Sequence, residues 1–106
     1  KEQRITLSLD RWNAKIQSLV LNPKNKRMHP FFTTIQPGGG SHGLYSHVGE
    51  EFGIVLQGEL EIDLNGVMHR VKEQESFYYN SSDPHSWTNP GDIDTIVVWV
   101  ISPPTF

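Results

Sequence analysis

The stretch that decides the fold class is ELEIDLNGVMHRV, residues 59–71. Its first half alternates acidic and apolar residues from Glu59 to Leu64, and a period of two is typical of a strand with one buried face. Asn65-Gly66 follows, and the alternation resumes in the second half. Because a type I′ turn needs a positive φ at both central positions, which Asn and Gly tolerate best, this stretch predicts a β-hairpin.

Short strand-like segments recur on both sides of the hairpin. The segments with alternating or β-branched apolar residues are 5–9, 16–21, 31–35, 52–56, 76–79 and 95–101. Turn-forming runs such as Pro37-Gly38-Gly39-Gly40 separate them, and no segment has the pattern of an amphipathic helix. About eight short strands between turns predict an all-β sandwich or a closed barrel.

Composition limits the class of protein. The 106 residues, 36% of them hydrophobic, are enough for one globular domain, which we expect to span residues 1–106. The absence of cysteine excludes a disulfide scaffold, thiolate metal ligands and a cysteine nucleophile, and it fits a reducing compartment, so we expect a cytoplasmic protein. No apolar run approaches about 18 residues, and no signal-peptide pattern follows Lys1, so we expect no membrane partner.

The charge balance argues against direct binding of nucleic acid. Nine Lys and Arg against twelve Asp and Glu give a formal net charge of −3, whereas nucleic-acid-binding domains are usually basic. The cations at residues 24–27 lack interleaved aromatic residues and are expected to be a solvated turn. The chain begins without Met, which suggests a mature or excised piece of a longer protein.

Candidate site residues lie in the segment before residue 52. Tyr45, His47 and Glu51 share the same parity, so on an extended segment they face one side, which in a barrel is the interior. A histidine and a carboxylate facing inward need a compensating partner, because burying them unpaired is costly. A divalent cation or a polar ligand would provide one; a hydrogen-bonded pair that stabilises the barrel is the simpler alternative.

A second histidine lies far along the chain, in Pro84-His85-Ser86-Trp87, between a predicted strand and a turn. If His85 faces the same cavity, His47, Glu51 and His85 form a two-histidine, one-carboxylate set that suits Zn, Fe, Mn or Ni and leaves coordination positions open. The simpler interpretation of His85 is a turn histidine.

Simpler positions are expected for the remaining histidines and for the tryptophans. His29 and His69 are expected at the surface, and His42, in the glycine-rich bend, could cover the mouth of a pocket. The three tryptophans are expected in the core or at a dimer interface: Trp12, Trp87 and Trp99.

These residues resemble the two motifs of the cupin superfamily over roughly residues 31–101. The first motif, G-x5-H-x-H-x3-4-E-x6-G, is matched from Gly39 to Gly58 by His47 and Glu51, with Tyr45 in place of the first histidine. The second, G-x5-P-x-G-x2-H-x3-N, keeps His85 and Asn89 and departs elsewhere, at Gln74, Asn80 and Ser82. The resemblance implies a small cupin β-barrel of the jelly-roll type, a double-stranded β-helix, with His47, Glu51 and His85 as metal ligands and Tyr45 in the ligand pocket.

A narrower resemblance concerns residues 47–58, 76–79 and 99–106. These look like the C-terminal cupin of XRE-type helix-turn-helix transcriptional regulators, in which a DNA-binding domain precedes the cupin. The resemblance implies a dimeric domain that senses a small-molecule effector, in some cases through a divalent metal, and that meets DNA only through a helix-turn-helix domain absent from these residues.

Two alternatives stay open. One is a stand-alone metal-dependent cupin enzyme, a dioxygenase or an isomerase, in which open metal positions activate oxygen or polarise a carbonyl. Tyr45 in place of a histidine, and the lack of a further acid–base group near the motif, make an enzyme the less favoured hypothesis. The other is a structural dimerisation barrel with an empty pocket, whose strand edges pair between subunits.

Overall fold

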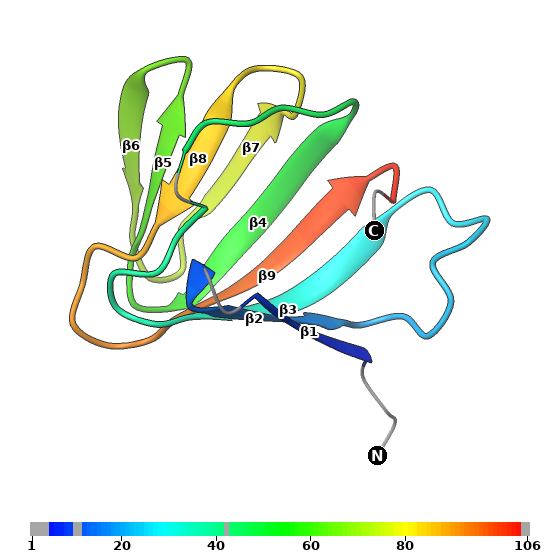
Figure 1. Cartoon of the computed structure of the whole chain (residues 1–106), viewed down its shortest axis with the longest axis horizontal. Helices are drawn as coiled ribbons and strands as arrows, with labels where there is room; N and C mark the ends of the chain where they lie inside the picture. Colours follow the sequence, from blue (N-terminus) through cyan, green and yellow to red (C-terminus); the bar gives the residue numbers. More distant parts are fainter. Residues whose placement is uncertain (1–4, 10–11, 42, 105–106) are drawn as a thin grey trace.

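The computed structural model of the chain describes residues 5–9, 12–41 and 43–104, and within them the protein is all-β (Figure 1). The elements are, in chain order, β1 (Ile5–Leu9), β2 (Ala14–Ser18), β3 (His29–Ile35), β4 (Glu50–Gln57), β5 (Leu60–Leu64), β6 (Val67–Val71), β7 (Ser76–Asn80), β8 (His85–Thr88) and β9 (Thr95–Ser102). No helix in the described residues has the length and apolar character needed to cross a membrane.

The strands form two antiparallel sheets that face each other. The longer sheet has the order β1-β2-β3-β9-β4-β7, and the shorter has the order β6-β5-β8. In Figure 1 the shorter sheet lies at the upper left and the longer one runs beneath it to the lower right. Isolated bridges from Gly40 to Thr88 and from Tyr45 to His85 place Gly40 and Tyr45 along the free side of β8. This arrangement confirms the predicted small cupin barrel of the jelly-roll type.

The hairpin that suggested the fold is present. Asn65 and Gly66 have φ angles of 53° and 87°, as the predicted turn requires, and they connect β5 to β6 in the register Leu64 opposite Val67. The expected alternation holds in β5 but not in β6. In β6 only Val71 is buried, because this strand is the edge of the shorter sheet.

Alternation also builds the core between the sheets. Inward side chains from both sheets meet there, and the aliphatic ones that are at most 1% exposed are Ile35, Val55, Leu60, Ile62 and Val97. Apolar surface of this kind, removed from water, is the main force holding two sheets together. The same alternation leaves the outer faces of both sheets without a second layer in the described residues.

Four strand predictions differ from the structure. β2 is Ala14–Ser18 rather than 16–21, because the pairing of this strand with β1 and with β3 runs from Ala14 to Ser18. β3 begins at His29, before Pro30, and buries that histidine to 3% exposure, so the expected surface position was wrong. Ser18 holds the His29 ring through a 2.8 Å contact with its Nε2. β4 begins at Glu50 rather than Phe52, which places Glu51 inside a regular strand.

The fourth difference is β8, which the sequence did not predict as a strand. Its four residues are too few to show a period, and Pro84 before it is typical of a turn. The strand exists because β5 pairs with it along one side, from Glu61 opposite Thr88 to Leu64 opposite His85. His85 is therefore a strand residue and not a turn residue.

Gly49 links the candidate site to the end of β9. Its φ angle is +117°, and a Cβ atom there would lie 2.0 Å from the carbonyl oxygen of Ser102. The close approach needs glycine, because any side chain would both strain the backbone and collide with it. The turn before β4 is thus packed directly against the C-terminal strand.

Replacing Gly49 with alanine is expected to lower the free energy of unfolding by about 3 kcal/mol, since backbone strain and a steric clash add together. Gly38→Ala is the matched control: Gly38 also has a positive φ, +79°, but nothing lies within 4 Å of the position that a Cβ atom would take there. We expect that variant to lose about 1 kcal/mol. Urea unfolding measures both, and equal losses would contradict the close packing of Gly49.

Candidate ligand and metal site

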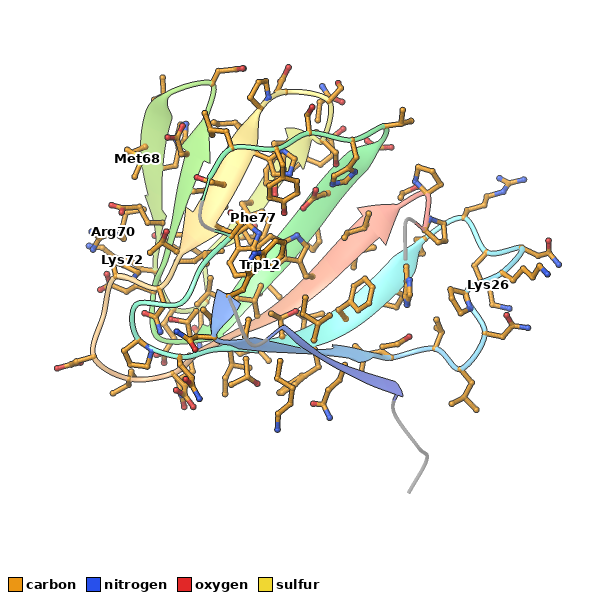
Figure 2. The ribbon with its side chains drawn as sticks, in the orientation of Figure 1. Trp12, Lys26, Met68, Arg70, Lys72 and Phe77 are labelled. Carbon is orange, nitrogen blue, oxygen red and sulfur yellow. The ribbon has the colours of Figure 1, made fainter. Side chains whose placement is uncertain are left out.

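A cavity of about 290 Å³ opens between the two sheets. Its lining residues come from both ends of the chain and are mostly aromatic or aliphatic: Trp12, Ile16, Phe31, Thr33, Tyr45, Ser46, His47, Glu51, Trp87, Trp99 and Ile101. Figure 2 shows Trp12 near the middle of the molecule, between the sheets. The cavity combines apolar walls with a small set of polar groups, as ligand pockets commonly do.

Glu51 is the polar centre of this cavity and is only 2% exposed. Its Oε1 accepts hydrogen bonds from the Tyr79 hydroxyl and the Trp99 indole N–H, both at 2.7 Å, and its Oε2 accepts one from the Ser81 hydroxyl at 3.0 Å. Burial alone would raise the pKa of this carboxyl group, but contacts with His85, Tyr79 and Trp99 lower it below its ordinary value. Glu51 is therefore held as a buried carboxylate.

His85 faces Glu51 from the shorter sheet and is fully buried. Its Nδ1 lies 2.8 Å from the carbonyl oxygen of Asp83, which can only accept, so Nδ1 carries the hydrogen. In a neutral ring Nε2 then presents a lone pair to Glu51 Oε2, 3.3 Å away, and it has no hydrogen-bond partner among the described residues. Two electron-rich atoms in this position need a proton or a cation between them.

The ionisation of His85 agrees with that geometry. Burial lowers the pKa of the imidazole, but the contacts with Glu51 and with the Asp83 carbonyl raise it more, so its pKa lies above the ordinary value. A proton can therefore supply the missing positive charge in the absence of a metal ion.

His47 completes the group from the segment that precedes β4. Its Nε2 lies 2.8 Å from Glu51 Oε2, and its side chain is 22% exposed. The backbone N–H of His47 donates to the carbonyl oxygen of Ser81 at 2.9 Å, which anchors the segment. His47 therefore stands between the buried carboxylate and the solvent.

The three side chains offer ligand atoms that all lie within 4.8 Å of one another. Two imidazole nitrogens and one carboxylate oxygen suit a first-row divalent cation and leave positions open for water or a ligand. The residues present fit such an ion, because His85 Nε2 is buried and aimed at Glu51 without a hydrogen-bond partner in the described chain. The structure thus brings His47, Glu51 and His85 together; their role as ligands stays a prediction.

Tyr45 lies beside the cluster, with its ring 4.4 Å from that of His85. Its hydroxyl accepts a hydrogen bond from the Trp87 indole N–H at 2.9 Å. Burial raises the pKa of Tyr45 well above its ordinary value, so the phenol stays protonated in this cavity. Tyr45 is therefore better suited to line the pocket than to bind a metal as a phenolate.

The tryptophans were only partly anticipated. Trp87 and Trp99 are buried as expected, but together with Trp12 they form an aromatic wall of the cavity, with ring centroids 5.3–5.5 Å apart. Tyr79 and Ser81, which hold the Glu51 carboxylate, were not predicted as site residues. The period-two pattern of 76–79 places Tyr79 on one face of its strand, but nothing local identifies Glu51 as its partner.

His69 is exposed on β6, as expected. His42, which was expected near the pocket mouth, lies outside the described residues.

The hydrogen bond from Tyr79 to Glu51 has a measurable consequence. We expect Tyr79→Phe to lower the free energy of unfolding by about 2 kcal/mol, because a buried carboxylate loses one of its donors. Tyr78→Phe is the matched control, since Tyr78 is 60% exposed and its hydroxyl donates to the exposed Glu50. Chemical denaturation of both variants provides the measurement. A loss in the control as large as that in Tyr79→Phe would contradict the assigned role of Tyr79.

Comparison with known proteins places this geometry in a family. The cupin-domain family model matches residues 31–101. The HTH-type transcriptional regulator PuuR of Escherichia coli is 33% identical over 85 residues, which are 80% of this chain and 45% of that protein; PuuR of Shigella flexneri gives the same values. The chain therefore spans less than half the length of these relatives.

Solved structures share the fold at lower sequence identity. The cupin domain of an XRE family transcriptional regulator from Enterobacter cloacae has a TM-score of 0.76 at 19% identity, covering 88% of this chain and 99% of that chain. A sugar phosphate isomerase of the cupin superfamily from Silicibacter pomeroyi has a TM-score of 0.74 at 16% identity, covering 87% and 60%. The family model matches more than half of this chain, so the chain belongs to the cupin family. The similarity to PuuR and to the XRE family domain shows that it is related to the cupin domains of helix-turn-helix regulators.

Proposed function

We propose that this chain is the effector-binding and dimerisation domain of a transcriptional regulator, with DNA bound by a helix-turn-helix part outside these residues. The observation that carries the proposal is the aromatic cavity around Glu51 in a chain 33% identical to the HTH-type regulator PuuR. A single cupin domain over residues 1–106 and a cytoplasmic location belong to the same proposal.

The size and lining of the cavity support a small organic ligand. About 290 Å³ lies at the lower end of the range for ligand pockets, so a small metabolite fits better than a polymer or a peptide. The aromatic rings offer stacking surfaces, whereas Thr33, Ser46 and His47 offer hydrogen-bonding groups at separate points of the wall. Such a division between apolar area and a few polar contacts supplies both affinity and selectivity.

The position of the cavity supports a way in which a bound ligand could affect the DNA-binding part of the regulator. Trp12 lines the cavity and lies between β1 and β2, close in sequence to the start of the chain. A ligand that contacts Trp12 can therefore alter the segment to which a preceding domain would be joined. Signalling requires that the ligand bind two arrangements of the regulator with different affinity.

A divalent cation at His47, Glu51 and His85 is compatible with this function. When bound, the ion would supply a positively charged contact for an electron-rich group of the ligand. Tyr79, Ser81 and Trp99 would orient the Glu51 carboxylate, and the Asp83 carbonyl would fix the tautomer of His85, as outer partners of metal ligands commonly do.

The second candidate function is a metal-dependent cupin enzyme, an isomerase or a dioxygenase. The same three-residue cluster favours it, since its open positions are those a substrate would need. Against it, Tyr79 already hydrogen-bonds Glu51, and burial raises the pKa of both tyrosine hydroxyls near the cluster, Tyr45 and Tyr79. Both hydroxyls therefore stay protonated, and neither is available as a general base.

The sensor proposal is tested by a thermal-shift screen of small metabolites. A true effector at about 100 times its Kd stabilises the fold by about 2.7 kcal/mol. Thr33→Met, which fills the cavity, should abolish the shift, whereas Thr34→Met, on the opposite face of β3, should keep it. The hit is then titrated against operator binding by the full-length regulator. Compounds that bind tightly without changing operator affinity would contradict the sensor function.

The metal prediction is tested with Zn²⁺ as the probe, by calorimetry on protein purified without a metal-affinity tag. We expect one ion per chain, with affinity reduced at least about 100-fold in His85→Ala and in Glu51→Gln, since each removes a ligand. His69→Ala removes an exposed histidine and should bind as the wild type does. Equal binding by all four proteins would rule out the proposed ligands.

A further inference from the structure

The hydroxyl group of Tyr45 has a hydrogen to donate and no acceptor for it in the part of the chain that the structure describes. Its oxygen accepts a hydrogen bond from the Trp87 indole N–H at 2.9 Å. A tyrosine hydroxyl can also donate one hydrogen bond. Because the indole N–H is itself a donor, the hydroxyl hydrogen of Tyr45 points away from Trp87. Both residues line the cavity, so this hydrogen is available to a molecule bound there.

The donors that surround Glu51 are, by contrast, already used within the protein. Three of them bind its carboxylate: Tyr79, Ser81 and Trp99. Trp87 donates to Tyr45 in turn. A donor left unpaired in a largely apolar cavity is unfavourable, so such groups normally have a partner. The Tyr45 hydroxyl is therefore the position at which a ligand can complete the hydrogen bonds of this group.

The backbone fixes the position of Tyr45. The N–H of Tyr45 donates to the carbonyl oxygen of His85, and the N–H of His85 donates to that of Tyr45, both at 2.9 Å. Trp87 lies two residues beyond His85 on β8, so both side chains project from the same face of that strand. A donor held in place by its backbone and by a neighbouring side chain loses little freedom when a ligand binds, which favours selective binding.

Tyrosine also changes what this position of the cupin motif can bind. The motif has a histidine here, whose ring nitrogen can offer a lone pair to a metal ion. The Tyr45 oxygen already accepts from Trp87, and the neutral hydroxyl offers a hydrogen instead. The partner of that hydrogen must be an acceptor, so the replacement directs this position toward an organic ligand.

The surroundings restrict the kind of acceptor. The ring centroid of Trp12 lies 6.0 Å from that of Tyr45 and 5.3 Å from that of Trp87, which provides an aromatic surface beside the hydroxyl. The carboxylate of Glu51 lines the same cavity and repels an anionic group, and none of the described lining residues is Lys or Arg. An uncharged oxygen attached to a flat apolar group therefore fits better than a carboxylate or a phosphate.

We propose that Tyr45 determines the specificity of the cavity by donating a hydrogen bond to an uncharged carbonyl oxygen of a small aromatic or apolar effector. The inference rests on the proposed function, because it assigns a ligand class to the same cavity. It does not require a metal ion, since Tyr45 is not one of the three candidate metal ligands.

Acetophenone is the probe, because it joins a flat ring to a carbonyl group, and ethylbenzene has nearly the same shape without the oxygen. Both are titrated against the purified chain in the presence of EDTA, with the NMR signals of the three indole N–H groups as the readout. Tyr45→Phe should weaken acetophenone binding at least about fivefold, the order expected for one neutral hydrogen bond, and should leave ethylbenzene binding within about twofold. Unchanged acetophenone binding, or an equal loss for ethylbenzene, would overturn the proposal.

Tyr78→Phe is the matched control, because it removes an exposed hydroxyl that donates to Glu50 outside the cavity, and it should bind both probes as the wild type does. Thr33→Val removes another hydroxyl of the cavity wall. A loss of acetophenone binding in Thr33→Val but not in Tyr45→Phe would overturn the assignment to Tyr45. Benzoate should bind the wild type at least about tenfold more weakly than acetophenone, since it places an anion beside Glu51; equal binding would overturn the uncharged class.

A second measurement needs only the wild type. Acetophenone labelled with ¹³C at the carbonyl reports the hydrogen bond directly, because donation to the carbonyl oxygen moves the carbon resonance downfield of its value in cyclohexane. A bound resonance at the cyclohexane value would overturn the proposal. If neither acetophenone nor ethylbenzene binds the wild type, the cavity itself is contradicted as a ligand site, and the proposed function fails together with this inference. Binding of both probes without dependence on Tyr45 contradicts only the inference.

Discussion

The buried carboxylate of Glu51 is the constraint on which the arrangement of the barrel depends. An ionised group at 2% exposure is costly unless donors surround it, and here the donors come from distant parts of the chain. Tyr79 approaches from β7, Ser81 from the following turn and Trp99 from β9, while His85 faces it from the other sheet. The requirements of one side chain thus set the relative positions of both sheets. In the proposed metal site a divalent cation would take the place of the proton on His85 beside Oε2, and either would leave the aromatic part of the cavity free for the proposed organic ligand.

β4 and β9 connect the inside of the barrel with its outside. Alternate residues of each strand contribute to the cavity and to the outer face of the longer sheet, so a displacement of either strand changes both. The contact of Gly49 with Ser102 joins the ends of the two strands and limits their independent movement. In the proposed regulator, a ligand in the cavity would therefore act on both strands at once.

Much of the fold could be predicted from local sequence. The hairpin at 59–71, the strand periodicity and the spacing of His47 and Glu51 led to an all-β cupin barrel, because alternation and turn chemistry act over a few residues. β8 could not be predicted, since four residues show no period, and its strand conformation comes from pairing with β5. The burial of His29 had no local signal either, because it depends on Ser18 in the neighbouring strand.

By itself, the sequence determined the class of fold, the candidate residues Tyr45, His47, Glu51 and His85, and the exclusion of thiolate and disulfide chemistry. Only the tertiary structure decided that Tyr79, Ser81 and Trp99 hold the carboxylate and that Trp12, near the start of the chain, lines the same cavity as Ile101. The physical reason is that the donors to Glu51 come from residues up to 48 positions away along the chain, and no local pattern records which of many possible donors is brought to one buried charge.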